Sequence, residues 1–418
     1  MQTAINTLIQ VIDCQALAPY LTHTSFLTPI SQESIMSPRI PIGIDEPGGS
    51  YTGPLLLAAG HRPFFLLAAL YATAGIAFWL AALNGYVGLP PSWHGHEMIF
   101  GFGTASLSGF MMAAVPKWTN SKATQGTPLA ILVALWLLGR GAVLSDNLAW
   151  LDLLHLPFLA FLVGRMIFGA GNKRNYIVPV MLLVLALINA LYHFGDSSLA
   201  LRAAAILMTG FIALIGGRVV PAFTQNALRM ATSKPVNCTT PAWTERLVLP
   251  LIFLVTGLEL LWPETPYSGT AALVTAAVLL VRMSGWQTGM TFSIPLVWIL
   301  HAGFFWLPLG FALKGLGDLG VLDDTTAAMH AMTAGAVGVM VLAMGSRAAL
   351  GHSGRPLHAT PMTVVTYVLI LAAVILRVFI PLDWAIPAAG VLWTIGWGMF
   401  SIVYWPVLAK PRIDGLPY

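Results

Sequence analysis

Two histidines and a glutamate, His94, His96 and Glu97, open an apolar stretch that carries no further charge until Lys117. A charged side chain at the centre of a bilayer costs about 2.5–3.5 kcal/mol on insertion scales, so ionisable groups at the mouth of such a stretch need partners. Iron and copper are partners that imidazole suits. On a regular helix, His94 and Glu97 share a face, whereas His96 points nearly opposite to His94. The pattern predicts a ligand site in which the two histidines serve different partners.

Small residues recur at four-residue spacing after Glu97, namely Gly101, Ala105, Gly109 and Ala113. Such a stripe lets a neighbouring helix, or a flat macrocycle, approach the backbone closely. Packing between helices with polar residues at the membrane interface is the alternative interpretation of this stretch.

His301 lies within another apolar stretch and shares a helical face with Trp298 and with Phe304 or Phe305. An imidazole among aromatic rings suits an axial haem ligand, which needs an apolar pocket. A hydrogen-bonded histidine on an aromatic packing face fits the same pattern, so both interpretations stay open.

His330 stands in a third apolar stretch, within a stripe formed by Ala327, Ala331 and Gly335. It has about the same expected depth as the two histidines near residue 95, so a site joining the two stretches is expected. The predicted metal ligands are His94, His96, His301 and His330.

A glycine-rich turn after the same stretch contains Arg347, His352 and Arg355. Two arginines and a histidine in such a turn bind an anion, for example haem propionates, through charge-assisted hydrogen bonds. The same residues also serve as topology anchors. Arg218 is expected on the same side of the membrane, and we predict cofactor contacts for His352, Arg218 and Arg347.

Membrane-spanning helices must position these residues. The chain of 418 residues is 57% hydrophobic and 9% charged, against roughly 25% charged in a soluble domain. A span needs about 20 apolar residues. We therefore predict an all-α polytopic membrane protein with twelve spans, over residues 64–83, 96–115, 128–145, 149–169, 176–194, 199–220, 246–262, 269–285, 294–313, 325–346, 361–380 and 386–408.

The basic residues fix the expected orientation. With twelve spans, sixteen of the 20 Lys and Arg residues fall on the side that holds both termini. The positive-inside rule then places both termini in the cytoplasm. The four basic residues on the outer side are Arg140, Arg202, Lys314 and Arg377.

The expected organisation is a mobile N-terminal tail over residues 1–59, a membrane domain over 60–412 and a short C-terminal tail over 413–418, with Met36 as an alternative start. The basic residues form no patch, so nucleic acid is not an expected partner. Cys14 and Cys238 lie far apart and suggest neither a disulfide framework nor a thiolate metal site.

The second, sixth and tenth spans end alike. Val115-Pro116 and Val220-Pro221 close two of them, and Gly217-Arg218 is similar to Ser346-Arg347. A unit of four helices repeated three times would place like ends on these spans. Haem–copper oxidases use such a plan of three four-helix arcs, although this analogy concerns the fold and does not establish the reaction.

Several motifs together resemble those of the NnrS family: WHGHEMIFGF at 93–102, GFMMAAVPKWT at 109–119, GGRVVPAFT at 216–224, LHAGFFWLPLG at 300–310, MHAMTAGAVG at 329–338 and SRAALGHSGRPL at 346–357. The resemblance covers roughly residues 60–412. It implies a twelve-span bacterial inner-membrane protein that contains haem b, with copper as a second metal. It also implies a link to denitrification and to nitric oxide resistance. The matching positions are His94, His96, Glu97, His301, His330 and His352.

The expected function is therefore that of a membrane haem protein that binds or detoxifies nitric oxide under nitrosative stress. Turnover, sensing and simple binding of the gas stay open. The expected partners are nitric oxide or another small gas and membrane lipid. A transporter of copper, haem or a small solute is the alternative, because polar groups within twelve spans suit one.

Overall fold

The helices begin and end at residues that favour helix termini. The computed structural model describes residues 51–145, 147–323 and 325–416. Pro266 and Pro361 stand in the first turn of their helices, where a missing N–H is harmless. Thr265 and Thr360 precede them and accept hydrogen bonds from backbone N–H groups. Asn120 ends another helix in the left-handed conformation, with φ of 48°.

The described residues form twelve helical segments and no strand, which confirms the all-α prediction. Ten of these segments are long and apolar enough to cross a membrane. The bounds of all twelve segments, of which α5 and α9 are not among the ten, are α2 His61–Leu83, α3 Pro91–His96 continuing through η3 Glu97–Gly103 into α4 Thr104–Thr119, α5 Thr127–Ala142, η4 Ala149–Leu154 with α6 His155–Gly169, η5 Lys173–Asn175 with α7 Ile177–Phe194, α8 Ser197–Thr232, α9 Ala242–Leu261, α10 Pro266–Met283, α11 Pro295–Asp318, α12 Thr326–His330 continuing through η7 Ala331–Gly338 into α13 Val339–His352, α14 Pro361–Phe379 and α15 Ala385–Ala409.

Helix α8 is longer than predicted. The sequence pattern ends the sixth span at residue 220, whereas α8 runs from Ser197 to Thr232 over 36 residues. At 1.5 Å per residue this is about 54 Å, well beyond the roughly 30 Å of hydrocarbon. Pro221 lies inside the helix and does not end it. A proline removes one backbone hydrogen bond, and the packing around the buried helix outweighs that loss.

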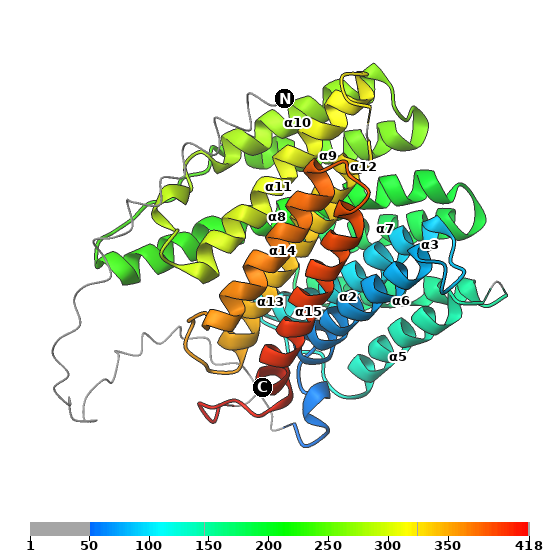
Figure 1. Cartoon of the computed structure of the whole chain (residues 1–418). Helices are drawn as coiled ribbons and strands as arrows, with labels where there is room; N and C mark the ends of the chain where they lie inside the picture. Colours follow the sequence, from blue (N-terminus) through cyan, green and yellow to red (C-terminus); the bar gives the residue numbers. More distant parts are fainter. Residues whose placement is uncertain (1–50, 146, 324, 417–418) are drawn as a thin grey trace. The chain divides into compact units, whose positions relative to one another are not determined.

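The second, sixth and tenth spans pack against one another. Together with α11, they are the most deeply buried of the ten spans. Contacts join η3 to α8, α8 to η7, and η3 to η7. The first and last spans are neighbours, because α15 packs against both α2 and α14 (Figure 1). The spans whose ends resemble one another in sequence therefore form the centre of the helix packing.

Two of these central spans contain a π-helical stretch. Glu97–Gly103 and Ala331–Gly338 have the wider turn, and the second stretch starts directly after His330. Such turns are rare and frequently occur at functional sites. Because η3 and η7 contact each other, the two wide turns lie at one place in the fold.

The small-residue stripe on the second span admits a neighbouring helix. A Cβ atom on Gly109 would lie 3.0 Å from Cβ of Phe64 and from Cδ1 of Phe65, both on α2. The stripe therefore brings α4 close to α2, which is the helix-packing interpretation and not the macrocycle one.

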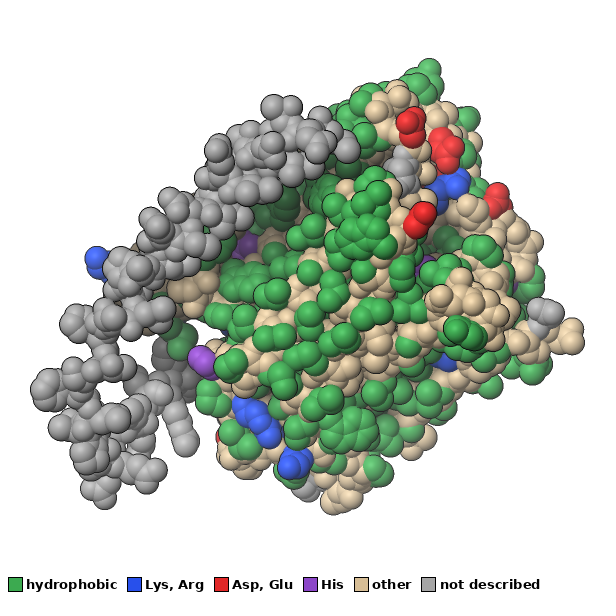
Figure 2. Space-filling model, viewed as in Figure 1, with side chains coloured by type: hydrophobic (Ala, Val, Ile, Leu, Met, Phe, Trp, Pro, Cys, Tyr) green, Lys and Arg blue, Asp and Glu red, His purple; other side chains and the backbone are tan. Residues whose placement is uncertain are grey.

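The outer surface suits a bilayer. Large hydrophobic side chains are exposed along most spans. In the view of Figure 2, hydrophobic side chains cover much of the surface between the ends of the helices. Of the predicted tails, residues 1–50 with Met36, and residues 417–418, lie outside the described residues.

Candidate functional site

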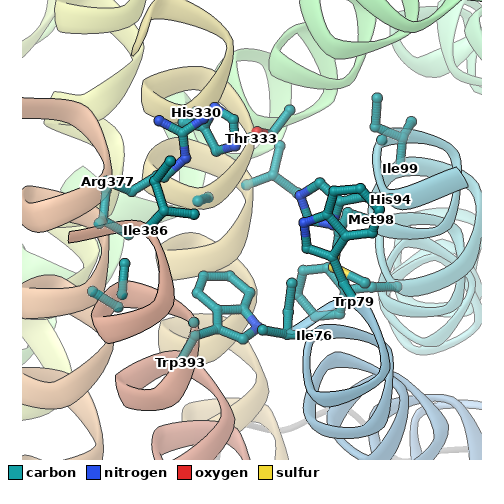
Figure 3. Close-up of a pocket in the computed structure, with 18 of the residues that line it drawn as sticks. Ile76, Trp79, His94, Met98, Ile99, His330, Thr333, Arg377, Ile386 and Trp393 are labelled. Carbon is teal, nitrogen blue, oxygen red and sulfur yellow. The ribbon is translucent and has the colours of Figure 1, made fainter. Parts of the chain in front are cut away.

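A cavity of about 170 Å³ lies between α2, the α3–η3 segment, the α12–η7 segment, α14 and α15. His94 and His330 line it from different helices, and Trp79 and Trp393 contribute to its walls (Figure 3). Arg377 is the one charged residue among the described lining residues. The expected site joining the second and tenth spans is therefore present as a mainly apolar cavity with two imidazoles.

The ring of His94 is held by stacking. Trp79 lies with its ring centroid 5.1 Å from that of His94, and the two planes differ by 12°. The Nδ1 atom of His94 is buried and has no hydrogen-bond partner among the described residues. Leaving a buried polar atom unpaired costs about 1–3 kcal/mol. A ligand for this nitrogen would remove that cost.

One nitrogen of His330 has a backbone partner. Its Nδ1 atom lies 2.8 Å from the carbonyl oxygen of Thr326. A carbonyl oxygen accepts hydrogen bonds, so Nδ1 donates. A hydrogen bond of this kind orients metal-binding histidines in general.

The two imidazoles lie close together with nearly parallel planes. Their centroids are 6.3 Å apart, and their planes differ by 17° in a stacked arrangement. The donor set of two neutral imidazoles suits iron and copper.

His96 faces a different environment, a buried cluster of charged groups. Its Nδ1 atom lies 2.7 Å from Oε1 of Glu97, and its Nε2 atom lies 3.1 Å from Oδ1 of Asn189 and 3.2 Å from Oδ2 of Asp152. Arg140 donates to Glu97 over 2.5 Å through Nη1 and to Asp152 through Nη2. We call these five residues the buried charge cluster.

Hydrogen bonding fixes the charge state of this cluster. Asn189 donates through Nδ2 to Asp152 over 2.7 Å, so its Oδ1 oxygen faces His96. Both ring nitrogens of His96 thus face oxygen acceptors, and His96 donates from both as a cation. Two cations then balance the carboxylates of Glu97 and Asp152. The cluster is electrically neutral, as burial in a low-dielectric interior requires.

A metal ion would compete with these bonds. His96, Asp152 and His193 offer ligand atoms within 4.8 Å of one another. However, Arg140 and Asn189 already donate to the oxygens of Asp152. The geometry gives His96 an ion-pairing role and does not bring it to His330.

Glu97 does not line the His94 cavity. Its carboxylate accepts hydrogen bonds from Tyr71 and Arg140. A fully buried carboxylate needs a cation, which Arg140 supplies.

His301 lies apart from the cavity with both nitrogens engaged. Its Nε2 atom lies 2.7 Å from Oγ1 of Thr224, and its Nδ1 atom lies 2.9 Å from Oγ1 of Thr288. Phe304 is buried on the same helix, whereas Phe305 is exposed. This arrangement fits the hydrogen-bonded interpretation of His301.

The residues predicted to bind an anion have separate partners. His352 stacks on His61, with ring centroids 4.6 Å apart. Arg218 donates to Asn175 over 2.9 Å. Arg347 lies over the ring of Phe223, 4.0 Å from its centroid. The structure does not gather them around one group.

Arg140 and Asp152 are not among the site residues predicted from the sequence. A signal was present, because Arg140 is one of four basic residues on the predicted outer side. All four have a place inside the protein: Arg140 in the buried charge cluster, Arg202 and Lys314 as partners of Glu259, and Arg377 at the histidine cavity.

The fold and the site define a multi-pass α-helical membrane protein with a pair of imidazoles across an apolar cavity and a neutral cluster of buried charges beside it. The sequence matches the family described as NnrS protein over residues 55–412, and the chain belongs to this family. It is thus a membrane protein associated with the nitric oxide response. A comparison with curated proteins gives no match.

Proposed function

We propose that the protein is a haem protein of the bacterial inner membrane that binds nitric oxide at the cavity between His94 and His330. Haem b is the proposed cofactor, and copper is the second candidate for the same pair of histidines. The proposed role is protection against nitric oxide during denitrification or nitrosative stress. The observation that carries this proposal is the buried Nδ1 atom of His94, which has no hydrogen-bond partner among the described residues, on a ring that lies 6.3 Å from the ring of His330.

Three of the lining residues carry groups that such a cofactor uses. His94 and His330 would hold the metal, and Trp79 would keep the plane of the His94 ring fixed by stacking. Arg377 is suited to a carboxylate such as a haem propionate. When bound, the metal would supply a coordination position for nitric oxide, which the gas would take in place of one of the two imidazoles.

The membrane location supports this role, because a small apolar gas concentrates in the bilayer. The proposed orientation has both termini in the cytoplasm, supported by sixteen of the 20 basic residues falling on that side.

Absorption spectroscopy and metal analysis of the purified protein test the proposal. Wild type should show a Soret band that shifts on addition of nitric oxide. His94→Ala and His330→Ala should lose most of the bound metal. His301→Ala is the matched control, since this buried histidine has two hydroxyl partners, and the variant should keep its metal.

Equal metal content in all four proteins would refute the ligand assignment. A colourless wild type that moves copper, haem or a small solute into vesicles would refute the haem proposal and support a transporter.

A further inference from the structure

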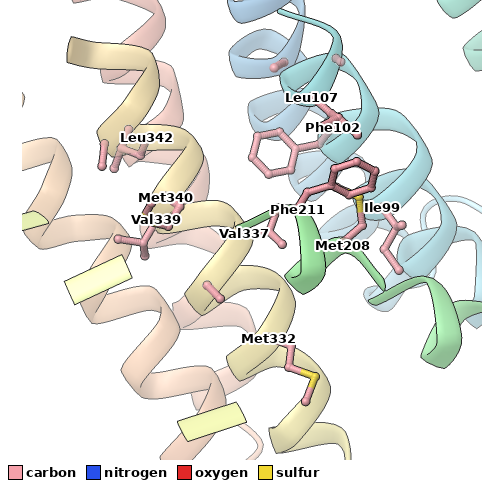
Figure 4. Packing of buried hydrophobic residues seen from close by; sticks show 14 of the residues in the cluster. Ile99, Phe102, Leu107, Met208, Phe211, Met332, Val337, Val339, Met340 and Leu342 are labelled. Atoms are coloured by element: carbon pink, nitrogen blue, oxygen red, sulfur yellow. The ribbon is translucent and has the colours of Figure 1, made fainter. Parts of the chain in front are cut away.

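A second, smaller cavity of about 60 Å³ adjoins the histidine cavity. It lies between α2, the η3–α4 segment, α8 and the η7–α13 segment, with Phe211 and Met340 among its walls. Met208 and Val337 line both cavities. Figure 4 shows Met208 and Phe211 from α8 near Val337 of η7. These two shared side chains therefore form the partition between the cavities.

The smaller cavity is too apolar to hold water. Ser106 is the one residue with a polar side chain among its described lining residues, and the Ser106 hydroxyl donates to the carbonyl oxygen of Phe102 over 2.8 Å. A buried water needs two to four polar partners, whereas dry apolar cavities of about 150 Å³ take up benzene or xenon. A cavity of this size and lining suits a small apolar gas.

One side of this cavity is partly exposed. It is lined by Phe110, Ile212, Ile215, Val341 and Met344, which are only partly buried, whereas Met208 and Val337 on the other side are almost fully buried. The partly buried residues lie well inside their helices, away from the ends. Their position is the part of a spanning helix that meets the hydrocarbon of a bilayer.

Two glycines keep the cavity open. A Cβ atom on Gly103 would lie 3.0 Å from Cε of Met208, and one on Gly216 would lie 3.0 Å from Cδ2 of Phe304. Both glycines line the cavity. A side chain at either position would press on Met208 or on Phe304 and Met340, and the displaced side chains would narrow the cavity.

We infer that this cavity is a holding site for a small apolar diatomic gas, and that Met208 and Val337 gate its passage from the bilayer to the His94–His330 cavity. The holding site stands on the cavity alone. The gating role rests on the proposed function, because it needs a gas-binding metal at the two histidines.

Xenon pressurisation tests the holding site without any metal. Crystals of the full chain exposed to xenon gas should show anomalous scattering beside Phe211 and Val337. The double variant Gly103→Ala with Gly216→Ala should lose that peak. Gly398→Ala is the matched control, since its added Cβ would meet Thr73 at an ordinary 3.7 Å and it lines neither cavity. Absence of xenon from the wild-type cavity would overturn the inference.

Carbon monoxide recombination after flash photolysis tests the gate. Met208→Ala should raise the bimolecular association rate several-fold, and the double glycine variant should lower it several-fold, with the Soret spectrum of each unchanged. If xenon binds but carbon monoxide associates at the same rate in all variants, the cavity is only a packing void. Met208 and Val337 would then not act as a gate. A protein without metal would refute the proposed function, and the xenon result would then decide the holding site.

Discussion

His94 and His96 lie two residues apart on one helix, yet their surroundings are opposite. His94 stacks on a tryptophan beside an apolar cavity, and its Nδ1 atom has no hydrogen-bond partner among the described residues. His96 faces acceptors at both nitrogens and completes a neutral set of charges with Arg140. The first environment leaves a nitrogen for a ligand, and the second uses both nitrogens for structure. Residue type alone does not distinguish them.

Removal of the arginine from the buried charge cluster should have the largest effect. Arg140→Met leaves the carboxylates of Glu97 and Asp152 with only His96 as cation. Breaking a buried pair in this way costs about 3–5 kcal/mol. We expect a strongly lowered melting temperature of the purified protein in detergent. Arg165→Met, on an exposed arginine, is the control. Equal melting of the two variants would contradict the cluster's role.

Replacement of the His96 imidazolium should lower the stability less than replacement of Arg140 does. His96→Leu removes hydrogen bonds to Glu97 and Asn189, for an expected loss of about 1–3 kcal/mol. Adding Glu97→Gln removes the excess negative charge and should restore part of the melting temperature. If the second substitution lowers it further, the two residues do not balance each other's charge.

Removal of the Tyr71 hydroxyl, which donates a hydrogen bond to Glu97, should lower the stability still less. Tyr71→Phe removes one hydrogen bond to this carboxylate. The expected loss is about 0.5–1.5 kcal/mol. Metal content measured beside the melting curve should stay at the wild-type value. Lost metal in this variant would mean that the charge cluster and the histidine cavity are coupled.

The smallest effect is expected at the cavity itself. His94→Leu in metal-free protein removes an unpaired polar atom from an apolar wall, so its melting temperature should equal or exceed that of wild type. The paired measurement is His96→Leu under the same conditions. If His94→Leu lowers the melting temperature as much as His96→Leu does, His94 has a structural role.

The spans and the depth of the histidines could be predicted from sequence. Apolar runs of sufficient length determine where helices form, and counting along them places His94 and His330 at the same end. Lateral neighbours could not be predicted, because depth does not reveal which helices touch. His301 is in a span as apolar as those of the other histidines, but its neighbours supply hydroxyls from Thr224 and Thr288.

The buried charge cluster was partly visible in the charge distribution. Arg140 breaks the positive-inside pattern, and an exception of that kind implies an acidic partner. Which acid it meets depends on the packing of α5 against η3 and η4, and the sequence does not encode that contact locally.

Because Ala331–Gly338 is π-helical, the direction of His330 depends on the number of residues in this stretch. Each residue of a regular helix turns the chain by about 100°. Deleting any one residue between Ala331 and Gly338 should let the segment relax to ordinary α-helical bonding and rotate His330 away from His94, although every histidine would still be encoded. Relatives that share these histidines but differ by one residue in this interval are therefore expected to have lost the facing pair.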